Sequence, residues 1–458
     1  MFLIPNYIST VSYKINSSDS RTYITNEKSG FYVLLDGESS DFFYHISKIN
    51  SYDDFLCYVE KNYLSKDDVE SFINQLIELG ILLDDSQNIT TNQDSIKQNT
   101  SSFVPSRPNE DELKQFYGEM ESWQCQNGFL SDLFIEMTHN CNLRCIHCFQ
   151  NDHSDKTEIT FESIKPVIDE AIKLGVYKIT LSGGECTLSK DFIDIVKYIR
   201  EKRLQLIIYT NGLFLYDNPE ILYELVSVYP HLISLSLYSM NPAIHDKITG
   251  VKGSHEKTLS VIKTLKEKDL YVSIKCFLTH LNADNHQEVI EFAEKNGLFA
   301  SVDFSFLNNV QKGNDSVQIT DSQIYNLMKD KKSLLHASTF NPIVIDEKFL
   351  NRQICRAGQQ TLTIQPNLDV IFCPSYNIVL GNLKDNSLYE IWKSEISLEC
   401  QSKCQKDLVE CYKEEFCKFC TYCPSFAIAE GKYLKKSQSL CRIAKLKYQA
   451  FQELNGVK

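Results

Sequence analysis

The segment Cys141-Asn-Leu-Arg-Cys145-Ile-His-Cys148 decides how the rest of this chain is understood. Its cysteines follow a C-x3-C-x2-C spacing, and three thiolates this close together can hold three irons of a four-iron, four-sulfur cluster. The run contains no fourth cysteine, so one iron is left open, which suggests chemistry at that iron. A zinc knuckle or three buried thiols are the alternatives, but structural zinc sites close with four ligands.

The residues on both sides place this run on a loop between a strand and a helix. Residues 132–137 form a short apolar run that is typical of a buried strand. Apolar residues then recur at helical spacing over residues 161–174. Loops that follow a strand and precede a helix form the catalytic end of barrel-like α/β folds, so we expect the cysteines at such a mouth.

A second motif follows the next strand. Residues 177–182 are typical of a strand and lead directly into Gly183-Gly184-Glu185. With C-x3-C-x2-C one strand earlier, the chain resembles the radical S-adenosylmethionine (SAM) enzymes over residues 132–306. The resemblance implies that Gly183, Gly184 and Glu185 bind the methionine amino group of SAM. Glycine lets the backbone approach a ligand closely, and a carboxylate accepts hydrogen bonds from an ammonium group.

Composition and charge narrow the possible classes of protein. The 458 residues are 43% hydrophobic, enough for several domains with sizeable cores. The formal net charge of −13 makes overall nucleic-acid binding unfavourable. No apolar stretch approaches the ~18 residues of a membrane span, and the first residues lack the pattern of a signal peptide. We therefore expect a cytoplasmic protein that binds neither nucleic acid nor membrane.

The first 85 residues contain three strand-like runs followed by three helical patterns. The runs cover residues 7–13, 21–25 and 30–35, and the helical patterns cover residues 41–49, 53–62 and 65–79. Ser65 is a suitable N-cap for the last helix and Gly80 a suitable end. This order resembles the winged helix-turn-helix-like domain that recognises the leader of ribosomally made peptides in the enzymes that modify them.

A DNA-binding winged helix is the competing interpretation of this unit. Its recognition helix would be residues 65–79, which carry four carboxylates and one lysine. That charge would repel phosphate groups. A leader peptide that adds as a strand to the edge of the domain fits better, because backbone hydrogen bonds supply affinity without positive charge.

The middle of the chain alternates strands and helices. The expected strands cover residues 132–137, 177–182, 204–210, 231–237, 271–278 and 301–306, and the helices between them lie near residues 161–174, 190–202, 218–228, 255–268 and 284–296. This alternation implies a parallel sheet. Six strands agree with the partial (β/α)6 barrel that the resemblance implies, and an open barrel leaves a lateral gap wide enough for a peptide.

Polar residues near the strand ends point toward the same mouth. By resemblance, Ser236 contacts the SAM ribose and Lys275 contacts the SAM carboxylate. Asp303 is a candidate for positioning the substrate. Ordinary polar residues at strand ends are the alternative for each, and no residue is assigned as catalytic.

Nine of the sixteen cysteines lie between residues 355 and 441, which is unusual in a compartment where disulfides are rare. The segments Cys355-Arg-Ala-Gly358, 362–374 and Leu380-Gly-Asn-Leu383 resemble a SPASM domain, which carries auxiliary four-iron clusters. One departure is Leu368, which stands where that family usually has glycine.

The resemblance suggests two auxiliary sites. The first is expected at Cys355 and Cys373, with Cys411 or Cys404 as a third ligand, and an open iron there could bind a substrate thiolate. The second is expected to use the later cysteines of the pattern, which are Cys417, Cys420, Cys423 and Cys441. Zinc is the alternative at the second site, since C-x2-C pairs also suit zinc.

Together these features predict five parts of an α/β protein. They are a winged-helix-like leader-recognition domain at residues 1–85, a linker at 86–125, a radical SAM partial barrel at 126–315, a bridging region at 316–350 and a SPASM domain at 351–458.

The favoured function is a maturase that binds a ribosomal precursor peptide through its leader and installs an intramolecular cross-link with a 5′-deoxyadenosyl radical. A cysteine thioether is the favoured bond, and a flavodoxin- or ferredoxin-type protein is the expected electron donor. The alternatives are a carbon–carbon or carbon–oxygen link, a formylglycine-type maturase and a redox-sensing regulator. The N-terminal unit speaks against the formylglycine type, and the intact Gly183-Gly184-Glu185 motif speaks against the regulator.

Overall fold

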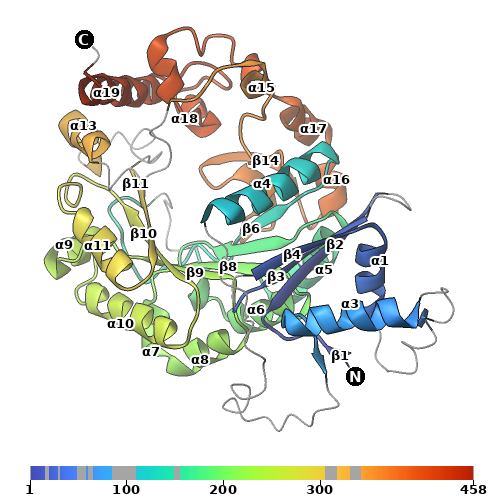
Figure 1. Cartoon of the computed structure of the whole chain (residues 1–458). Coiled ribbons are helices and arrows are strands. Elements are labelled where there is room, and N and C mark those ends of the chain that lie inside the picture. Colours follow the sequence, from blue (N-terminus) through green and yellow to red (C-terminus); the bar gives the residue numbers. More distant parts are fainter. Residues whose placement is uncertain are drawn as a thin grey trace.

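Figure 1 shows the computed structural model of the chain, which describes residues 2–15, 20–28, 31–48, 58–59, 65–84, 110–148, 155–304, 317–330 and 342–456. A β-rich N-terminal unit, a central barrel of parallel strands and a C-terminal cysteine-containing region follow one another along the chain. Among the helices of these ranges, none combines the length and the apolar character that a membrane crossing requires.

The described residues contain one large sheet, with the strand order β11-β10-β9-β8-β7-β6-β12-β13-β14. Its six barrel strands are parallel and agree with those expected from the sequence, although the last begins at residue 299 rather than 301. They are β6 (Asp132–Glu136), β7 (Lys178–Ser182), β8 (Gln205–Thr210), β9 (Leu232–Ser236), β10 (Val272–Phe277) and β11 (Phe299–Asp303). The α/β partial barrel is therefore confirmed.

The C-terminal region continues this sheet. Strand β12 (Thr361–Ile364) pairs with β6 in parallel, and β13 (Asp369–Cys373) and β14 (Tyr376–Asn382) follow as antiparallel strands. Leu368, in the turn between β12 and β13, has a φ of +71°. That left-handed backbone conformation favours glycine, which the family usually has at this position.

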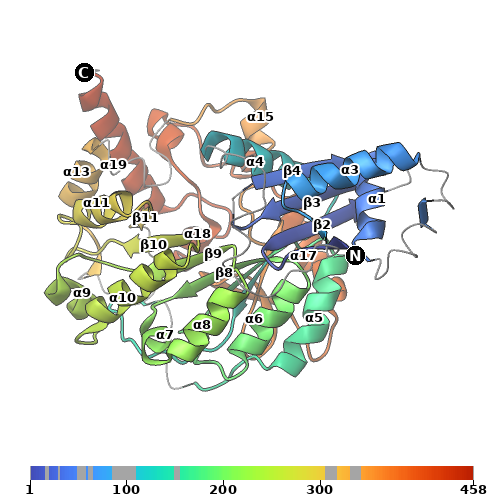
Figure 2. The ribbon, with the colours of Figure 1, turned by 60° about the horizontal axis from the view of Figure 1, so that its bottom comes forward.

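Helices cover the outer face of the barrel strands, as Figure 2 shows for α5, α6, α8 and α10. The five expected helices are α5 (Phe161–Lys173), α6 (Phe192–Glu201), α8 (Pro219–Ser227), α10 (Ser254–Glu267) and α11 (Gln287–Lys295). Two short helices, α7 (Leu213–Asp217) and α9 (Pro242–Thr249), were not expected. Each follows the end of a barrel strand and so lies at the mouth.

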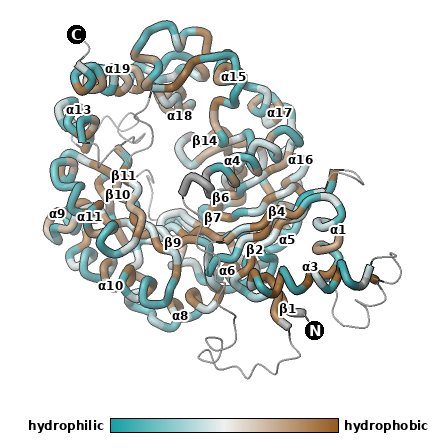
Figure 3. Tube along the Cα trace, in the orientation of Figure 1, coloured by the Kyte–Doolittle hydropathy of each residue, from teal (hydrophilic) through white to brown (hydrophobic). Residues whose placement is uncertain are grey.

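The barrel strands bury most of their side chains. Residues of the strands and of the covering helices form one large core, and Figure 3 shows apolar residues concentrated on the central strands. Positions that remain partly exposed alternate along the strands, as for Phe134, Tyr209, Ser236, Lys275 and Asp303. Successive side chains of a strand point to opposite faces, so these five residues belong to the inner face of the barrel.

The N-terminal unit contains an antiparallel sheet in the order β2-β3-β4. Its elements are β2 (Ile8–Lys14), β3 (Ser20–Asn26), β4 (Phe31–Asp36), α1 (Gly37–Ile46) and α3 (Lys66–Glu78), while β1 (Phe2–Leu3) pairs with β5 (Leu83–Asp84). Ser65 caps α3 by accepting from the Asp68 amide at 3.4 Å, and Gly80 ends it with a φ of +66°. The helix expected at residues 53–62 lies outside the described residues except for residues 58–59.

Buried arginine fixes this unit on the barrel. Arg200 of α6 is 5% exposed, and its guanidinium donates to Ser9 Oγ and to the Asn6 carbonyl, each at 2.7 Å. Arg203 donates to two carbonyls of the N-terminal segment at 2.9 Å. A buried guanidinium without partners is strongly unfavourable, so these bonds hold the two units together.

Part of the range expected to be a linker is a helix. Helix α4 (Glu110–Gln126) packs Phe116, Met120 and Trp123 against Tyr13 of the N-terminal unit and Tyr177 of the barrel. The aromatic cluster adds contact area between these units, because aromatic side chains bury large apolar surfaces.

The C-terminal region has a small core of its own. Its helices are α13 (Asp321–Lys329), α15 (Glu347–Leu350), α16 (Leu388–Trp392), α17 (Glu395–Ser402), α18 (Pro424–Ala429) and α19 (Gln438–Leu454), with 3-10 turns η4 (Gln405–Asp407) and η5 (Glu415–Phe419). Six buried residues form the core of the cysteine-bearing part, and Cys355, Cys411, Cys420 and Cys423 pack against it. So small a core is marginal alone, and metal clusters commonly staple such regions.

Candidate functional site

The C-x3-C-x2-C loop leaves β6 and runs beside the end of α9. The amide of Arg144 donates to the Thr249 carbonyl at 2.8 Å, and that of Ile146 donates to the Ile248 carbonyl at 2.9 Å. Gly250 follows with a φ of +72°, where an added Cβ would lie 2.8 Å from the Arg144 carbonyl oxygen. The unexpected helix α9 thus supports the cysteine loop from outside.

The three thiols of the loop lie close to one another. Burial, the charge of Glu185 and then the charge of Cys148 raise the pKa of Cys141 to about 12. Burial and the charges of Cys141 and Cys148 raise the pKa of Cys145. The Leu143 amide donates to Cys141 Sγ at 3.4 Å, a hydrogen bond that favours a thiolate. Clustered thiols that repel one another as thiolates, with an amide donor beside them, fit an iron–sulfur cluster.

The Gly-Gly-Glu backbone packs directly against the segment that enters this loop. An added Cβ at Gly183 would lie 2.4 Å from the Thr138 carbonyl oxygen, and one at Gly184 would lie 2.3 Å from that of Asn140. The amides of Gly184 and Glu185 donate to these carbonyls at 2.7 and 2.9 Å. The glycines therefore let two backbone segments meet, which places the motif beside the cysteines.

The carboxylate of Glu185 is buried in a hydrogen-bond network. Its Oε1 accepts from the hydroxyls of Thr187 and Thr210 at 2.6 Å each, and its Oε2 accepts from the Asn211 amide at 2.7 Å. Burial nevertheless raises the pKa of Glu185. A carboxylate oxygen accepts more than one hydrogen bond, so Oε2 retains capacity for a ligand ammonium.

Asn211 joins this network to the cysteine loop. Its Nδ2 donates to Asn142 Oδ1 at 2.7 Å and lies 3.9 Å from Cys141 Sγ. The sequence predicts a strand that ends at residue 210, and no role is assigned there to the residues that follow it. The strand-end position was the available signal.

Ser236 and Lys275 are direct neighbours in the parallel register of β9 and β10. The ammonium of Lys275 lies 3.7 Å from the centre of the Tyr209 ring, a cation–π contact. Tyr209 in turn contacts Phe134 across the sheet, with ring centres 6.1 Å apart. The structure therefore brings Ser236 and Lys275 together on the inner face and adds Tyr209, which sequence reasoning missed.

An aromatic wall backs the cysteine loop. His147 lies edge-on to Tyr238 at 4.6 Å between ring centres and contacts Phe277 at 5.9 Å. Burial lowers the pKa of His147 to about 4, so the imidazole is neutral. A hydrogen bond with Tyr238 lowers the pKa of Cys145 against the larger effect of burial. This wall covers one side of the cysteine loop, whose three cysteines remain partly exposed.

Asp303 lies near Lys447 of α19. Burial lowers the pKa of Lys447, while the charges of Cys420 and Asp303 raise it. Lys447 is 7% exposed, so a buried cation stands between the last barrel strand and the C-terminal cysteines. Asp303 of the last barrel strand therefore interacts with the C-terminal region through Lys447.

Four C-terminal cysteines surround one small pocket. Cys411, Cys417, Cys420 and Cys441 all line it, together with Tyr412. Burial raises the pKa of Cys420 to about 12, and the charges of the other three cysteines add to this effect. We refer to these four residues as the outer cysteine set.

A second set contains Cys355, Cys373 and Cys423. Burial raises the pKa of Cys373 to about 11, and the charges of Cys355 and Cys423 add to this effect. Cys400 lies beside this set, because its Sγ would be 2.8 Å from a Cβ added at Gly358.

The side chain of Gln359 ties Cys400 to Cys355. Its Nε2 donates to the Cys400 carbonyl at 2.9 Å, and its Oε1 accepts from the Cys355 amide at 3.4 Å. We refer to Cys355, Cys373, Cys400 and Cys423 as the inner cysteine set.

This grouping differs from the one expected from the sequence, which put Cys423 with Cys417 and Cys420 and offered Cys411 or Cys404 to the first site. The 3-10 turn η5 contains Cys417, and Cys420 follows as its C-cap three residues later, a spacing at which side chains eclipse in such a turn. The backbone is extended at both Cys420 and Cys423, so an odd separation turns Cys423 to the opposite face. Pro424 was the signal, because residues before proline favour extended backbone.

Cys404 belongs to neither set. Burial raises the pKa of Cys125, and the charge of Cys404 raises it further, so Cys404 lies near Cys125. In the described ranges, no three His, Cys, Asp or Glu side chains already converge as they would around a single metal ion.

Comparisons with known proteins agree with this geometry. Residues 135–295 match the radical SAM superfamily, and residues 355–424 match the SPASM iron–sulfur cluster-binding domain. The chain therefore contains a radical SAM domain and a C-terminal SPASM domain, and domains of these two kinds bind SAM and four-iron, four-sulfur clusters.

Similar proteins act on different substrates. The subtilosin biosynthesis protein AlbA of Bacillus subtilis is 26% identical over 331 residues, which are 68% of this chain and 70% of that protein. The AdoMet-dependent heme synthase of Methanosarcina barkeri is 26% identical over 328 residues, which are 66% of this chain and 93% of that protein. The structure of Streptococcus suis SuiB bound to precursor peptide SuiA covers 96% of this chain and all of that one, with a TM-score of 0.59 and 16% identity.

Proposed function

We propose that this protein binds a ribosomally made precursor peptide through its leader and installs an intramolecular cross-link, with a cysteine thioether as the favoured bond. One observation carries the proposal. A small β-rich unit, whose three-stranded sheet ends at β4 in the part of the chain that the structure describes, is fixed to a radical SAM barrel through buried Arg200. Two sets of cysteines follow in the C-terminal region. The likeness to the peptide-bound SuiB structure over 96% of the chain and the relative AlbA support it.

The leader adds as a strand beside β4. This strand is the last of the three-stranded sheet as far as the structure describes it, and Leu34 on it is 41% exposed. Strand addition draws affinity from backbone hydrogen bonds and specificity from alternate side chains. Because the unit is fixed on the barrel, a bound leader holds the rest of the peptide near the mouth at high effective concentration.

The first cluster is held by Cys141, Cys145 and Cys148. When bound, this cluster and SAM supply the one-electron bond cleavage that starts radical chemistry. Gly183, Gly184 and Glu185 receive the amino group of SAM, Ser236 its ribose and Lys275 its carboxylate. Lys275 is already held by its contact with Tyr209, so it is positioned before the ligand arrives.

The outer cysteine set, Cys411, Cys417, Cys420 and Cys441, holds one auxiliary cluster with four thiolates. The inner set, Cys355, Cys373 and Cys423, holds the other, with Cys400 as the fourth ligand. Clusters held by these two cysteine sets would serve as acceptors for the electron that leaves the peptide when the cross-link closes. Iron and sulfide contents near twelve each per chain are expected, since three four-iron clusters carry about that number.

A thioether is the favoured bond because the cysteine-rich C-terminal region is suited to binding a substrate thiol. Carbon–carbon and carbon–oxygen links remain the alternatives within this class. A tetrapyrrole substrate is the competing class, because the heme synthase relative is matched over 93% of its length. The N-terminal unit favours the peptide.

Mass spectrometry of the precursor peptide, made with and without this enzyme, tests the proposal. Each cross-link should remove about 2 mass units, and a thioether should also block alkylation of the linked cysteine. A peptide of unchanged mass, incubated with an enzyme that cleaves SAM, would contradict a maturase. Conversion of a heme precursor instead would favour the heme synthase class.

A further inference from the structure

We propose that a basic pocket over the outer cysteine set is the docking site of an acidic one-electron carrier protein of the flavodoxin or ferredoxin class. The proposal rests on the proposed function insofar as that set holds an auxiliary cluster. The carrier would bind on the face formed by α19 and the loop that precedes it.

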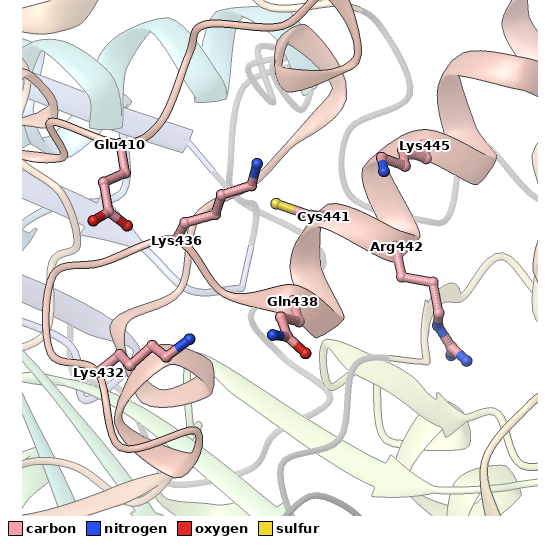
Figure 4. Close-up of a pocket in the computed structure, with 7 residues that line it drawn as sticks. All are labelled: Glu410, Lys432, Lys436, Gln438, Cys441, Arg442 and Lys445. Carbon is pink, nitrogen blue, oxygen red and sulfur yellow. The ribbon is translucent and has the colours of Figure 1, made fainter.

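Figure 4 shows the pocket, which has a volume of about 440 Å³. Lys432 and Lys436 come from the loop that precedes α19, and Arg442 and Lys445 project from α19 itself. All four side chains are exposed. Cys441 also lines the pocket, and its sulfur points into it in Figure 4.

The pocket continues into the outer cysteine set. Cys441, Lys436 and Glu410 line both this pocket and the smaller one that Cys411, Cys417 and Cys420 surround. The basic pocket is therefore the solvent side of the proposed cluster. A protein docked there would bring its own redox group close to that cluster.

The charge of this face is opposite to that of the chain. The whole protein carries −13, whereas the three lysines face one carboxylate, Glu410, within the pocket lining. Arg442 is engaged by Asp321 at 3.2 Å. For the three lysines, the described residues provide no ion-pair partner. A positive patch on a negative protein attracts and orients an acidic partner at long range.

Exposed apolar residues adjoin the charges. Val409, next to Glu410 in the chain, is 73% exposed, and Tyr433, next to Lys432, is 43% exposed. Apolar contact surrounded by charges suits a weak, short-lived complex, and redox encounters use small interfaces.

The position favours a carrier over an acidic segment of the precursor peptide. The pocket lies by α19, and the N-terminal unit, where the leader is proposed to bind, lies at the opposite side of the molecule in Figure 1. In the docked complex one electron crosses between the outer cluster and the carrier. After the cluster has accepted the electron that leaves the peptide, it loses that electron and the oxidised carrier gains it; mixing with reduced carrier follows the same contact in reverse. No covalent bond forms or breaks, so the step needs no further reactant.

Charge reversal tests the site in the full-length, cluster-loaded protein. The variant carries Lys432→Glu, Lys436→Glu and Lys445→Glu. A matched control carries Lys263→Glu, Lys268→Glu and Lys384→Glu, which change the net charge equally at exposed positions elsewhere. Binding of oxidised flavodoxin is measured at low and high salt, and cluster reduction is followed by absorbance after mixing with reduced flavodoxin or with dithionite.

At low salt, we expect the pocket variant to bind flavodoxin at least tenfold more weakly than the control does. We also expect flavodoxin to reduce it at least tenfold more slowly. The difference should shrink at high salt, because salt screens exposed charges. Reduction by dithionite should be equal in both. Equal reduction by flavodoxin in both variants would overturn the proposal.

Three further outcomes are informative. If the pocket variant loses iron, the neutral variant with glutamine at the same three positions replaces it, and unchanged reduction by flavodoxin would then overturn the proposal. Weaker binding of the precursor peptide with unchanged flavodoxin binding would assign the pocket to an acidic peptide instead. Inorganic phosphate at millimolar concentration is also tested as a ligand of the pocket. If phosphate binds there while the pocket variant and the control bind flavodoxin equally, the pocket is an anion site and not a docking site.

Failure of this site and failure of the proposed function are distinguishable. Dithionite supplies electrons without a carrier, so cross-linking driven by dithionite tests the function alone. A carrier effect without any peptide product would leave the docking site standing and contradict the maturase.

Discussion

The barrel and the C-terminal region both gather cysteines, but they do so by different means. In the barrel, Cys141, Cys145 and Cys148 lie within eight residues of one loop, whose backbone is bonded to α9 and to the Gly-Gly-Glu motif. In the C-terminal region, the outer set combines a loop, a 3-10 turn and α19 over residues 411–441. Sequence spacing alone is therefore enough to propose the first site, whereas the proposed second site depends on how separate elements fold together.

The largest effect is expected from the compact site. Replacing Cys145→Ala removes a thiolate that no neighbouring residue can supply, so cleavage of SAM should fall to background. The matched control is Cys276→Ala, a buried cysteine on β10 outside all three groups, which should retain cleavage. Detection of 5′-deoxyadenosine by chromatography measures both. Retained cleavage in Cys145→Ala would refute the assignment of the loop.

The grouping of the C-terminal cysteines gives the next largest effect. Cys411→Ser should remove the outer cluster and lower the iron content by about four per chain, while Cys404→Ser should leave it unchanged. Cleavage of SAM should persist in both variants, because the barrel cysteines are intact. The peptide product should be lost only in Cys411→Ser.

A double variant sharpens this test. If Cys411 and Cys441 serve one cluster, replacing both should lower the iron content no further than replacing one, since losses within one unit do not add. If Cys411 and Cys423 serve different clusters, their losses should add. Additive loss for Cys411 with Cys441 would restore the grouping expected from the sequence.

The order of elements and the barrel could be predicted because they depend on local patterns. Apolar runs, helix caps and the Gly-Gly-Glu motif gave the six strands and five helices of the barrel nearly at their observed positions. Helix α4 was missed, because its sequence is polar and its aromatic residues find partners in other elements, such as Tyr13, Tyr32 and Tyr177. The grouping of the cysteines expected from the sequence differs from the one proposed from the structure for a related reason. Whether Cys423 faces Cys420 or Cys373 depends on backbone direction, which spacing alone does not encode.

A smaller effect is expected where the substrate is proposed to enter. Leu34→Asp places a charge on the exposed side of edge strand β4 and should weaken leader binding by about tenfold, or about 1.4 kcal/mol. Cleavage of SAM without peptide should be unchanged. Binding of a labelled leader, followed by fluorescence anisotropy, measures the effect. Leu398→Asp, at an exposed position on α17, is the control.

This point variant is preferable to removal of the N-terminal unit. Deletion would leave Arg200 without its bonds to Ser9 and Asn6 and would destabilise the barrel itself. A leader that binds Leu34→Asp as tightly as the unchanged protein would move the docking site away from β4.

The smallest effect tests how the barrel and the outer set communicate. Lys447 is a buried cation between Asp303 and Cys420, and a positive charge near a cluster favours its reduced state. Lys447→Met should therefore lower the reduction potential of the outer cluster, and Asp303→Asn should raise it. Shifts on the order of tens of millivolts are expected, since unit charges at moderate separation in a protein interact by about 1 kcal/mol. Opposite signs, measured by EPR-monitored redox titration, would show an electrostatic link, whereas shifts of the same sign would indicate a change of packing instead.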